Sequence, residues 1–330
     1  MTGSTTATGP ERIVDIAVGY MAAKQLFASS RIGLFRALAD GPLSAPELAE
    51  KTGKPEKVVR ILGDAMSSLG LLSRANGRYE LGPDAAAYLT EDGTGPDLAP
   101  FLTFLESISY GHWLRFGDTV DTGEPAELDL TGERWDTFLS GVMTYNALHA
   151  KTLVSAFDFT PYATMLDLGG LSSAFAVEAM RANENLCTTF VFAPESVGPV
   201  IAAVREAGVA DRCTVLGEPT ASARPEGEFD VVMVNHVVHR FGAAENAVIL
   251  RNARAAAAPG ARLLLLDFFL DDDEVQRPLD ALHAGEYLVI DGTVVYPEAE
   301  VRGWLDGAGW RVVDRLALPG SPRVLVAEAV

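Results

Sequence analysis

The chain has 330 residues, 48% of them hydrophobic and 22% charged, with a formal net charge of −19 at neutral pH. This composition is typical of a folded globular protein and excludes collagen-like and intrinsically disordered chains. The acidic excess disfavours binding to nucleic-acid phosphates. The two cysteines, Cys187 and Cys213, lie in apolar, strand-like runs, so neither a disulfide framework nor a zinc site is expected. No apolar run is long enough to span a membrane and no signal peptide is seen, which predicts a cytoplasmic protein without a membrane or nucleic-acid partner.

The N-terminal part has the pattern of a winged helix, which we place at residues 11–95, after a disordered tail over residues 1–10. Lys54, Lys57 and Arg60 could face DNA, but acidic residues accompany them, so we interpret this domain as a dimerisation scaffold and a pocket wall. The predicted elements are, in chain order, a helix from Ile13, a helix from Ile32, a helix begun by a capping box of Ser44 and Glu47, a helix over residues 55–69, and a hairpin over residues 71–81 with Asn76 and Gly77 at its turn.

Residues 96–160 are expected to form a helical connector that lines a pocket. Aromatic residues recur there at helical spacing, and most of them are expected in a core or an interface. Two stretches, at residues 111–113 and 143–149, combine aromatic and polar side chains and could line a pocket instead. The candidate pocket residues in them are His112, Trp113, Met143, Asn146 and His149.

From residue 161 to residue 330 the pattern changes to alternating strands and helices. This alternation predicts an α/β domain whose largely parallel sheet has helices on both faces, and the closeness of the last two strands predicts an antiparallel hairpin. Such sheets bind ligands at the carboxyl ends of their strands. The predicted strands span residues 164–168, 188–192, 213–216, 229–234, 262–267, 311–315 and 323–328.

The sequences around these strand ends resemble a known family, the small-molecule O-methyltransferases with an N-terminal winged-helix dimerisation domain. The resemblance covers residues 13–330 and rests on Leu-Asp-Leu-Gly-Gly at residues 166–170, Asn-His-Val-Val-His at residues 235–239 and Pro-Gly-Ala-Arg-Leu-Leu at residues 259–264. It implies a class I methyltransferase fold with a Rossmann-like sheet, and a homodimer. It also implies methyl transfer to an oxygen or ring nitrogen of a small planar aromatic or heterocyclic substrate in secondary metabolism.

The same resemblance implies an S-adenosylmethionine site, and the chain departs from the family's pattern within it. Leu171 and Ser173 stand where the loop usually has glycines, and Ala193 stands where the second strand usually ends in an acid that binds the ribose hydroxyls. Glycine lets the backbone approach a ligand closely, and a methyl group accepts no hydrogen bond. Either another small-molecule methyl donor or another chemistry has replaced the cofactor, which we favour, or the cofactor binds in an altered pose. The residues implied to bind it are Asp167, Gly169, Gly170 and Glu218.

The resemblance implies that His239 is the catalytic base, because it stands where the family has its histidine. A histidine titrates near neutral pH and can take a proton from a hydroxyl or ring N–H as the methyl group moves. The glutamate that often supports this histidine in the family is replaced by Val295. The residues expected to bind the substrate are Trp113, Met143, Asn146, His149, His236, His283 and Glu286.

Two other functions remain open. An apolar pocket with a few polar groups is compatible with a cofactor-independent cyclase, lyase or isomerase on a methyltransferase scaffold, because a fold does not fix a function. A non-catalytic binding protein is the third reading. We expect no metal site, because the consecutive acids at residues 271–274 point in different directions and are typical of a solvated loop.

Overall fold

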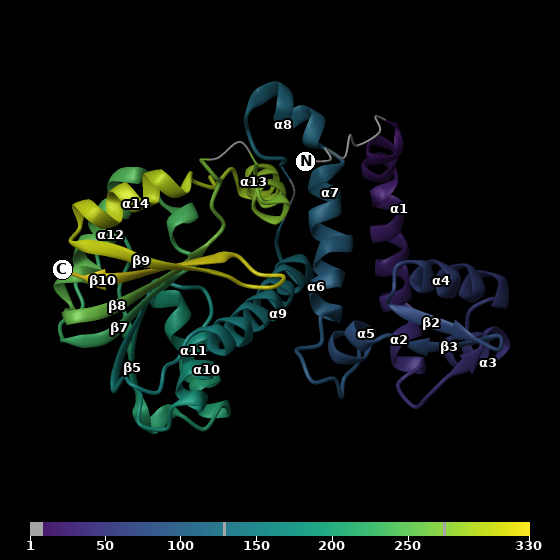
Figure 1. Ribbon diagram of the computed structural model, residues 1–330, viewed down its shortest axis with the longest axis horizontal. Helices are drawn as coiled ribbons and strands as arrows, with labels where there is room; N and C mark the ends of the chain where they lie inside the picture. Colours follow the sequence, from purple (N-terminus) through teal and green to yellow (C-terminus); the bar gives the residue numbers. More distant parts are fainter. Residues whose placement is uncertain (1–8, 128–129, 273–274) are drawn as a thin grey trace, which may run out of the picture. The chain divides into compact units, whose positions relative to one another are not determined.

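The structure is a computed structural model that describes residues 9–127, 130–272 and 275–330 (Figure 1). It divides into two compact units, one of Met1–Tyr110 with Leu130–Thr144, the other of Gly111–Asp129 with Tyr145–Val330. Most of the expected N-terminal tail and the last two acids of the run at residues 271–274 lie outside the described residues. Within the described ranges, no helix is long and apolar enough to cross a membrane.

The first unit combines helices with a small antiparallel sheet in the order β1-β3-β2, as the pattern of helices and a hairpin predicts. The amide and hydroxyl of Ser44 donate to one carboxylate oxygen of Glu47 at 2.7 and 2.6 Å, so the capping box begins α3. Asn76 and Gly77 have φ angles of 52° and 74°, which the predicted two-residue turn requires. The elements are α1 (Glu11–Arg31), α2 (Leu34–Ala37), β1 (Leu43–Ser44), α3 (Ala45–Thr52), α4 (Glu56–Ser68), β2 (Leu72–Ala75), β3 (Arg78–Leu81), α5 (Pro83–Tyr88), α6 (Ala99–Phe104), the π-turn Leu105–Ser109 and the first part of α9 (Glu133–Ala156).

The second unit is built on a seven-stranded sheet with the order β6-β5-β4-β7-β8-β10-β9 (Figure 1). Strands β4 to β8 pair in parallel, and β10 pairs antiparallel with β8 and β9, so the expected α/β sheet and its terminal hairpin are confirmed. The strands are β4 (Thr164–Leu168), β5 (Cys187–Phe192), β6 (Cys213–Gly217), β7 (Phe229–Asn235), β8 (Ala257–Asp267), β9 (Trp310–Ala317) and β10 (Arg323–Ala329).

Strand β8 departs most from the range that the sequence predicts. Strand β8 begins at Ala257 instead of residue 262, and its register shifts, because Ala257 pairs with Phe229 while Arg262 pairs with Val231. Gly260, with a φ of 74°, lies in the unpaired stretch. An irregularity of this kind interrupts the apolar alternation from which a strand is predicted.

Helices cover both faces of this sheet. On one face α12 and α14 pack on Leu166, Leu168 and their neighbours. On the other face the end of α9, together with α10 and α11, packs on Met165 and Phe190. Alternate residues of a strand point to opposite faces, which accounts for the split of β4 between the two cores. The helices of the unit are α7 (Tyr110–Trp113), α8 (Phe116–Thr122), α10 (Ala174–Ala182), α11 (Val197–Glu206), α12 (Ala243–Ala255), α13 (Pro278–Asp291) and α14 (Glu298–Gly307).

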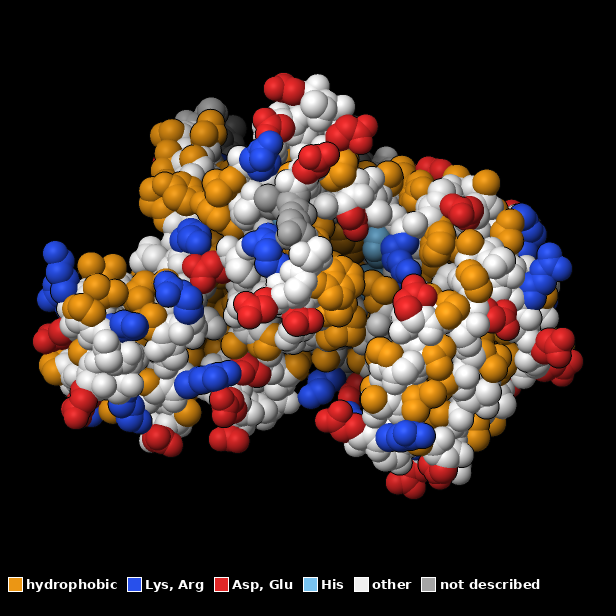
Figure 2. Space-filling view, turned by 180° about the vertical axis from the view of Figure 1, so that it is seen from behind, with side chains coloured by type: hydrophobic (Ala, Val, Ile, Leu, Met, Phe, Trp, Pro, Cys, Tyr) orange, Lys and Arg blue, Asp and Glu red, His pale blue; other side chains and the backbone are white. Residues whose placement is uncertain are grey.

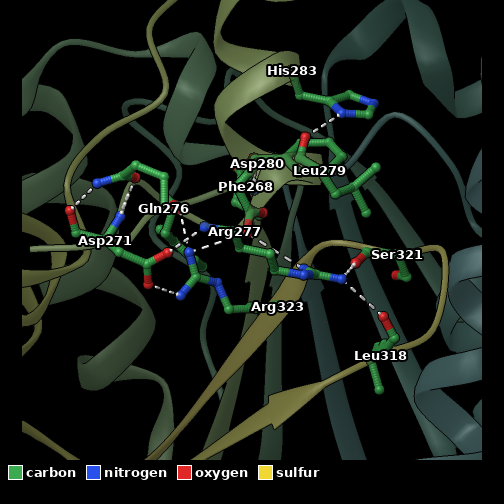
Figure 3. Close-up of polar contacts among 12 residues, drawn as sticks. Phe268, Asp271, Gln276, Arg277, Leu279, Asp280, His283, Leu318, Ser321 and Arg323 are labelled. Atoms are coloured by element: carbon green, nitrogen blue, oxygen red, sulfur yellow. Dashed lines mark hydrogen bonds and ion pairs between the residues drawn. The ribbon is translucent and has the colours of Figure 1, made fainter. Parts of the chain in front are cut away.

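A buried ion-pair network anchors the start of α13 (Figure 3). The Arg323 guanidinium pairs with Asp271, with Asp280 at 3.1 Å and with Glu298 at 3.5 Å, and all four side chains are almost inaccessible to solvent. Arg277 donates to the carbonyl groups of Leu318 and Ser321 in the turn that precedes β10. The network therefore fixes α13, which carries several of the predicted site residues, to the sheet.

Candidate active site

The candidate site lies at the carboxyl ends of β7 and β8. After β7, His236 adopts a left-handed conformation with a φ of 54°, and its backbone N–H donates to the carbonyl of Leu266 at 2.8 Å. A short 3-10 turn, Val238–Arg240, follows and places His239 over the end of β8. Ligands of doubly wound sheets bind at such strand ends.

His239 and Asp267 form a hydrogen-bonded dyad. Nδ1 of His239 lies 2.9 and 3.0 Å from the two carboxylate oxygens of Asp267, which is fully buried. Burial by itself would raise the pKa of Asp267, but His239 and the backbone N–H of Phe268 bring that pKa below its ordinary value, so the carboxylate stays ionised. Nδ1 must therefore carry the proton, and Nε2 is left with a lone pair that can accept one.

Aromatic side chains surround this dyad. Tyr287 stacks on His239 with ring centroids 4.4 Å apart, and Phe268 stacks on His283 at 3.9 Å. Nδ1 of His283 donates to the carbonyl of Leu279 at 2.7 Å (Figure 3), which leaves its Nε2, 3.4 Å from the Tyr145 hydroxyl, as an acceptor. Burial raises the pKa of both tyrosines, so both hydroxyls stay protonated.

A second imidazole pair lies beside the dyad. Nδ1 of His149 and Nε2 of His236 are 3.1 Å apart, and the ring of His236 meets that of His239 edge-on at 6.2 Å. Burial lowers the pKa of His236 to about 4 and lowers that of His149 well below its ordinary value. Both rings are therefore uncharged at neutral pH.

The structure brings most of the predicted substrate residues into the second unit. Trp113 donates to Glu286 at 2.5 Å, and Asn146 is buried one turn before His149. Met143 belongs to the part of α9 in the first unit.

Sequence reasoning missed the partner of His239. Val295, which replaces the expected glutamate, is buried and apolar. The acid beside His239 is instead Asp267, at the end of the neighbouring strand β8. An aspartate that ends an apolar run was a signal for this, because parallel neighbours end at the same edge of a sheet. The other residues that the prediction left out are Tyr145, Arg240, Phe268 and Tyr287.

His236, His239 and Asp267 also form a group whose possible metal-ligand atoms lie within 4.8 Å of one another. Ligands of a bound ion, at about 2.0–2.2 Å from it, lie closer together, at roughly 3–3.5 Å. The shortest contact in the group is already explained by the hydrogen bond between His239 and Asp267. The geometry is that of an imidazole hydrogen-bonded to a carboxylate, and we assign no metal to the group.

Three of the four predicted cofactor residues, Asp167, Gly169 and Gly170, lie at the end of β4 and in the loop that follows it, and Glu218 follows β6. Gly169 has a φ of 78°, and a Cβ there would lie 2.2 Å from Thr220, so the position requires glycine. Its carbonyl accepts a hydrogen bond from Nη1 of Arg240 at 2.8 Å. Burial raises the pKa of Asp167 well above its ordinary value, and its Oδ2 has no hydrogen-bond partner among the described residues.

The remaining positions of this loop and its surroundings differ in exposure. Leu171 exposes 40% of its surface, whereas Ser173 is buried, and Ala193 and Glu218 are half-buried. The carboxylates of Asp267, Glu195 and Asp291 offset part of the cost of burying the Arg240 charge. The guanidinium of Arg240, from the turn after β7, therefore lies against the loop after β4.

Comparisons with known proteins give consistent results. The O-methyltransferase dimerisation domain matches residues 14–91 and the O-methyltransferase domain matches residues 126–311. The 3-hydroxy-5-methyl-1-naphthoate 3-O-methyltransferase of Streptomyces sahachiroi is 30% identical over 96% of this chain and 94% of its own. The tetracenomycin polyketide synthesis 8-O-methyl transferase TcmO of Streptomyces glaucescens is 27% identical over 99% of both chains. Among solved structures, the S-adenosylmethionine-dependent methyltransferase SibL in its apo form has a TM-score of 0.84 at 26% identity, covering 97% of this chain and 99% of its own.

Proposed function

The chain belongs to the O-methyltransferase family with an N-terminal dimerisation domain, and on that premise we propose that it methylates an acidic O–H or ring N–H of a planar aromatic metabolite. The observation that carries this proposal is the dyad of His239 and Asp267 beneath stacked aromatic rings. Relatives act on naphthoate and tetracenomycin compounds, which are planar polycyclic aromatics, and this supports the substrate class.

In the proposed reaction His239 is the general base. The acceptor O–H or N–H gives its proton to Nε2 of His239, and Asp267 stabilises the imidazolium that results. The acceptor atom forms a bond to the methyl carbon as the bond from that carbon to a positively charged sulfur or nitrogen of the donor breaks. The electron pair of that bond stays on the donor atom, which becomes neutral. Holding donor and acceptor in line supplies several kcal/mol of the barrier reduction.

The family is S-adenosylmethionine-dependent, but we infer that the loop of this chain does not fit that cofactor. Arg240 donates to the carbonyl of Gly169 and so brings a positive charge to the loop that, by the family resemblance, would meet the ammonium group of the methionine part. Ala193 offers the ribose hydroxyls no acceptor, and Leu171 places a branched side chain on the loop. We therefore propose a smaller donor, with the methyl group on a sulfonium or a quaternary ring nitrogen, that binds without this loop.

The test is a transfer assay with CD3-labelled donors. The full chain is incubated with 3-hydroxy-1-naphthoate and, separately, with S-methylmethionine, 1-methylpyridinium or S-adenosylmethionine. A CD3-labelled product from either small donor, lost in His239→Gln, supports the proposal. Efficient transfer from S-adenosylmethionine, with micromolar binding in calorimetry, contradicts the inference about the donor and leaves the base assignment standing. A product of unchanged mass favours the cyclase or isomerase alternative.

We also propose a homodimer that buries one face of α1. Ile13, Ile16 and Tyr20 expose 72%, 75% and 53% of their surface, and Figure 2 shows hydrophobic side chains gathered there. Contiguous exposed apolar residues usually mark an interaction surface. The match of residues 14–91 to a dimerisation domain supports a second copy of the chain as the partner.

A further inference from the structure

Four of the five histidines of the chain lie together in the second unit. His236 contacts both His149 and His239, and Tyr287 contacts both His239 and His283. The proposed function uses one of them as a base. The pair of His149 and His236 needs a separate explanation, because buried polar side chains are costly unless they have a role in hydrogen bonding.

The backbone of His236 has a strained, left-handed conformation, which sets the orientation of its ring. His236 and Asn76 are the two non-glycine residues with positive φ in the part of the chain that the structure describes, and Asn76 lies in a hairpin turn where that conformation is normal. Strained conformations outside turns persist at functional sites, where the surrounding structure enforces them. Here the hydrogen bond from the His236 N–H to Leu266 holds the strain.

The surroundings of His149 determine where the protons of the pair lie. Nε2 of His149 is fully buried without a hydrogen bond of regular geometry in the described chain, and the backbone carbonyl of Gly320 acts on this ring so as to favour its protonated form. Nδ1 of His149 faces His236, which leaves Nε2 as the ring nitrogen that can meet this carbonyl. A ring N–H near a carbonyl is attracted, whereas a lone pair is repelled, so we assign the proton of His149 to Nε2. Nδ1 of His149 is then an acceptor, and Nε2–H of His236 donates to it.

The consequence is that Nδ1 of His236 holds a lone pair. The site then has acceptor atoms on two different rings, Nδ1 of His236 and Nε2 of His239. The rings of His236 and His239 have centroids 6.2 Å apart, and one ring nitrogen of each lies within 4.8 Å of the other and of a carboxylate oxygen of Asp267. One planar ligand with two donor groups on one edge can reach two rings this close together, because each hydrogen bond is about 2.7–3.0 Å long.

We propose that His149 and His236 form a hydrogen-bonded imidazole pair in which Nδ1 of His236 is an acceptor beside the base His239. A substrate that uses both acceptors carries two adjacent hydrogen-bond donors on one edge of a planar ring. This specificity inference rests on the proposed function. His239 takes the proton of the group that is methylated, and His236 accepts a hydrogen bond from the second donor. Aromatic compounds with vicinal hydroxyls, or with a hydroxyl next to a ring N–H, belong to this class.

The first test needs no ligand. In protein labelled with 15N at histidine, long-range 1H–15N correlation spectra distinguish the two tautomers of each ring, and single His→Gln variants assign the signals. We expect His149 and His236 to be protonated at Nε2 and unprotonated at Nδ1 at pH 7. A proton on Nδ1 of His236 would make it a donor to the ligand and would overturn the proposal.

The second test measures discrimination between two probes. We expect calorimetry to show 2,3-dihydroxynaphthalene binding the full chain at least about tenfold more tightly than 2-naphthol, because a site that pairs with a second hydroxyl rejects the analogue that lacks it. In His236→Asn this ratio should fall to near one. Asparagine tolerates the left-handed backbone but is too short to replace the ring.

The outcomes separate this inference from the proposed function. Equal binding of both probes to the native protein refutes the two-donor recognition while the aromatic site stands. Binding of neither probe contradicts the aromatic substrate class itself. An unchanged ratio of the two affinities in His236→Asn shows that another group binds the second hydroxyl, which also refutes the role of His236. If the variant does not fold, the tautomer spectra of the native protein still decide the question.

Discussion

Replacing Asp267 by asparagine tests the central feature of the site. The carboxylate is fully buried, stays ionised and receives the Nδ1 proton of His239 at 2.9 Å. Asparagine has almost the same shape, so the change removes the charge without leaving a cavity. A hydrogen bond to a charged group contributes about 1.5–3 kcal/mol, and each 1.4 kcal/mol corresponds to a factor of ten in rate. We therefore expect the rate of methyl transfer in Asp267→Asn to fall by about 10- to 150-fold.

The assay is the initial rate of labelled product formation at saturating donor and acceptor, together with the KM for each. The loss should appear in kcat, because Asp267 orients the base and does not contact the substrate. Asp291→Asn is the matched control, since Asp291 is an exposed carboxylate that also acts on Tyr287 and should leave the rate unchanged. A rate within twofold of the native protein, with the variant shown to be folded, would refute the role of Asp267.

Three further predictions concern stability and assembly. In the folded state His236 has a pKa of about 4, whereas in the unfolded chain it takes up a proton below about pH 6.5, so the free energy of unfolding should decrease by up to about 3 kcal/mol for this group as pH falls from about 6.5 towards 4. Urea titrations should show that the unfolding free energy of His236→Asn depends less steeply on pH. The same pH dependence in the variant and the native protein would contradict the assignment. Ile16→Glu on the exposed face of α1 should convert the dimer to a monomer in light scattering, whereas the equally exposed Val275→Glu should not; a monomeric native protein would refute the interface. Arg323→Met should lower the free energy of unfolding by about 3–5 kcal/mol, because it leaves buried carboxylates without their cation. Arg311→Met, which breaks an exposed pair, should lower it by less than about 1 kcal/mol. Similar losses for both variants would show that the network does not stabilise α13.

Much of the fold could be predicted because its signals are local. The Ser44 and Glu47 capping box and the Asn76-Gly77 turn are each contained in a few residues, and both form as predicted. The alternation of apolar strands and helices predicted a largely parallel sheet with an antiparallel end. The start of β8 was missed because an irregularity at Gly260 interrupts the pattern.

The candidate site was predictable only in part. The family resemblance singled out His239, and the strand-end rule placed it at the right edge of the sheet. It could not supply Asp267 as its partner, because the position compared with the family's glutamate holds Val295. The resemblance also gave no reason to connect Arg240 with Gly169, since neither residue type predicts a contact with the other.

The sequence by itself therefore predicted most of the elements and the α/β class, and it singled out His239, which we propose as the base. The tertiary structure decided which side chains meet, because their separations along the chain are large: 28 residues between His239 and Asp267, 71 between Arg240 and Gly169, and 87 between His149 and His236. The physical reason is the strand order. Because β7 lies between β4 and β8 in the sheet, the residues that follow these three strands converge at one edge, and no local pattern encodes that order.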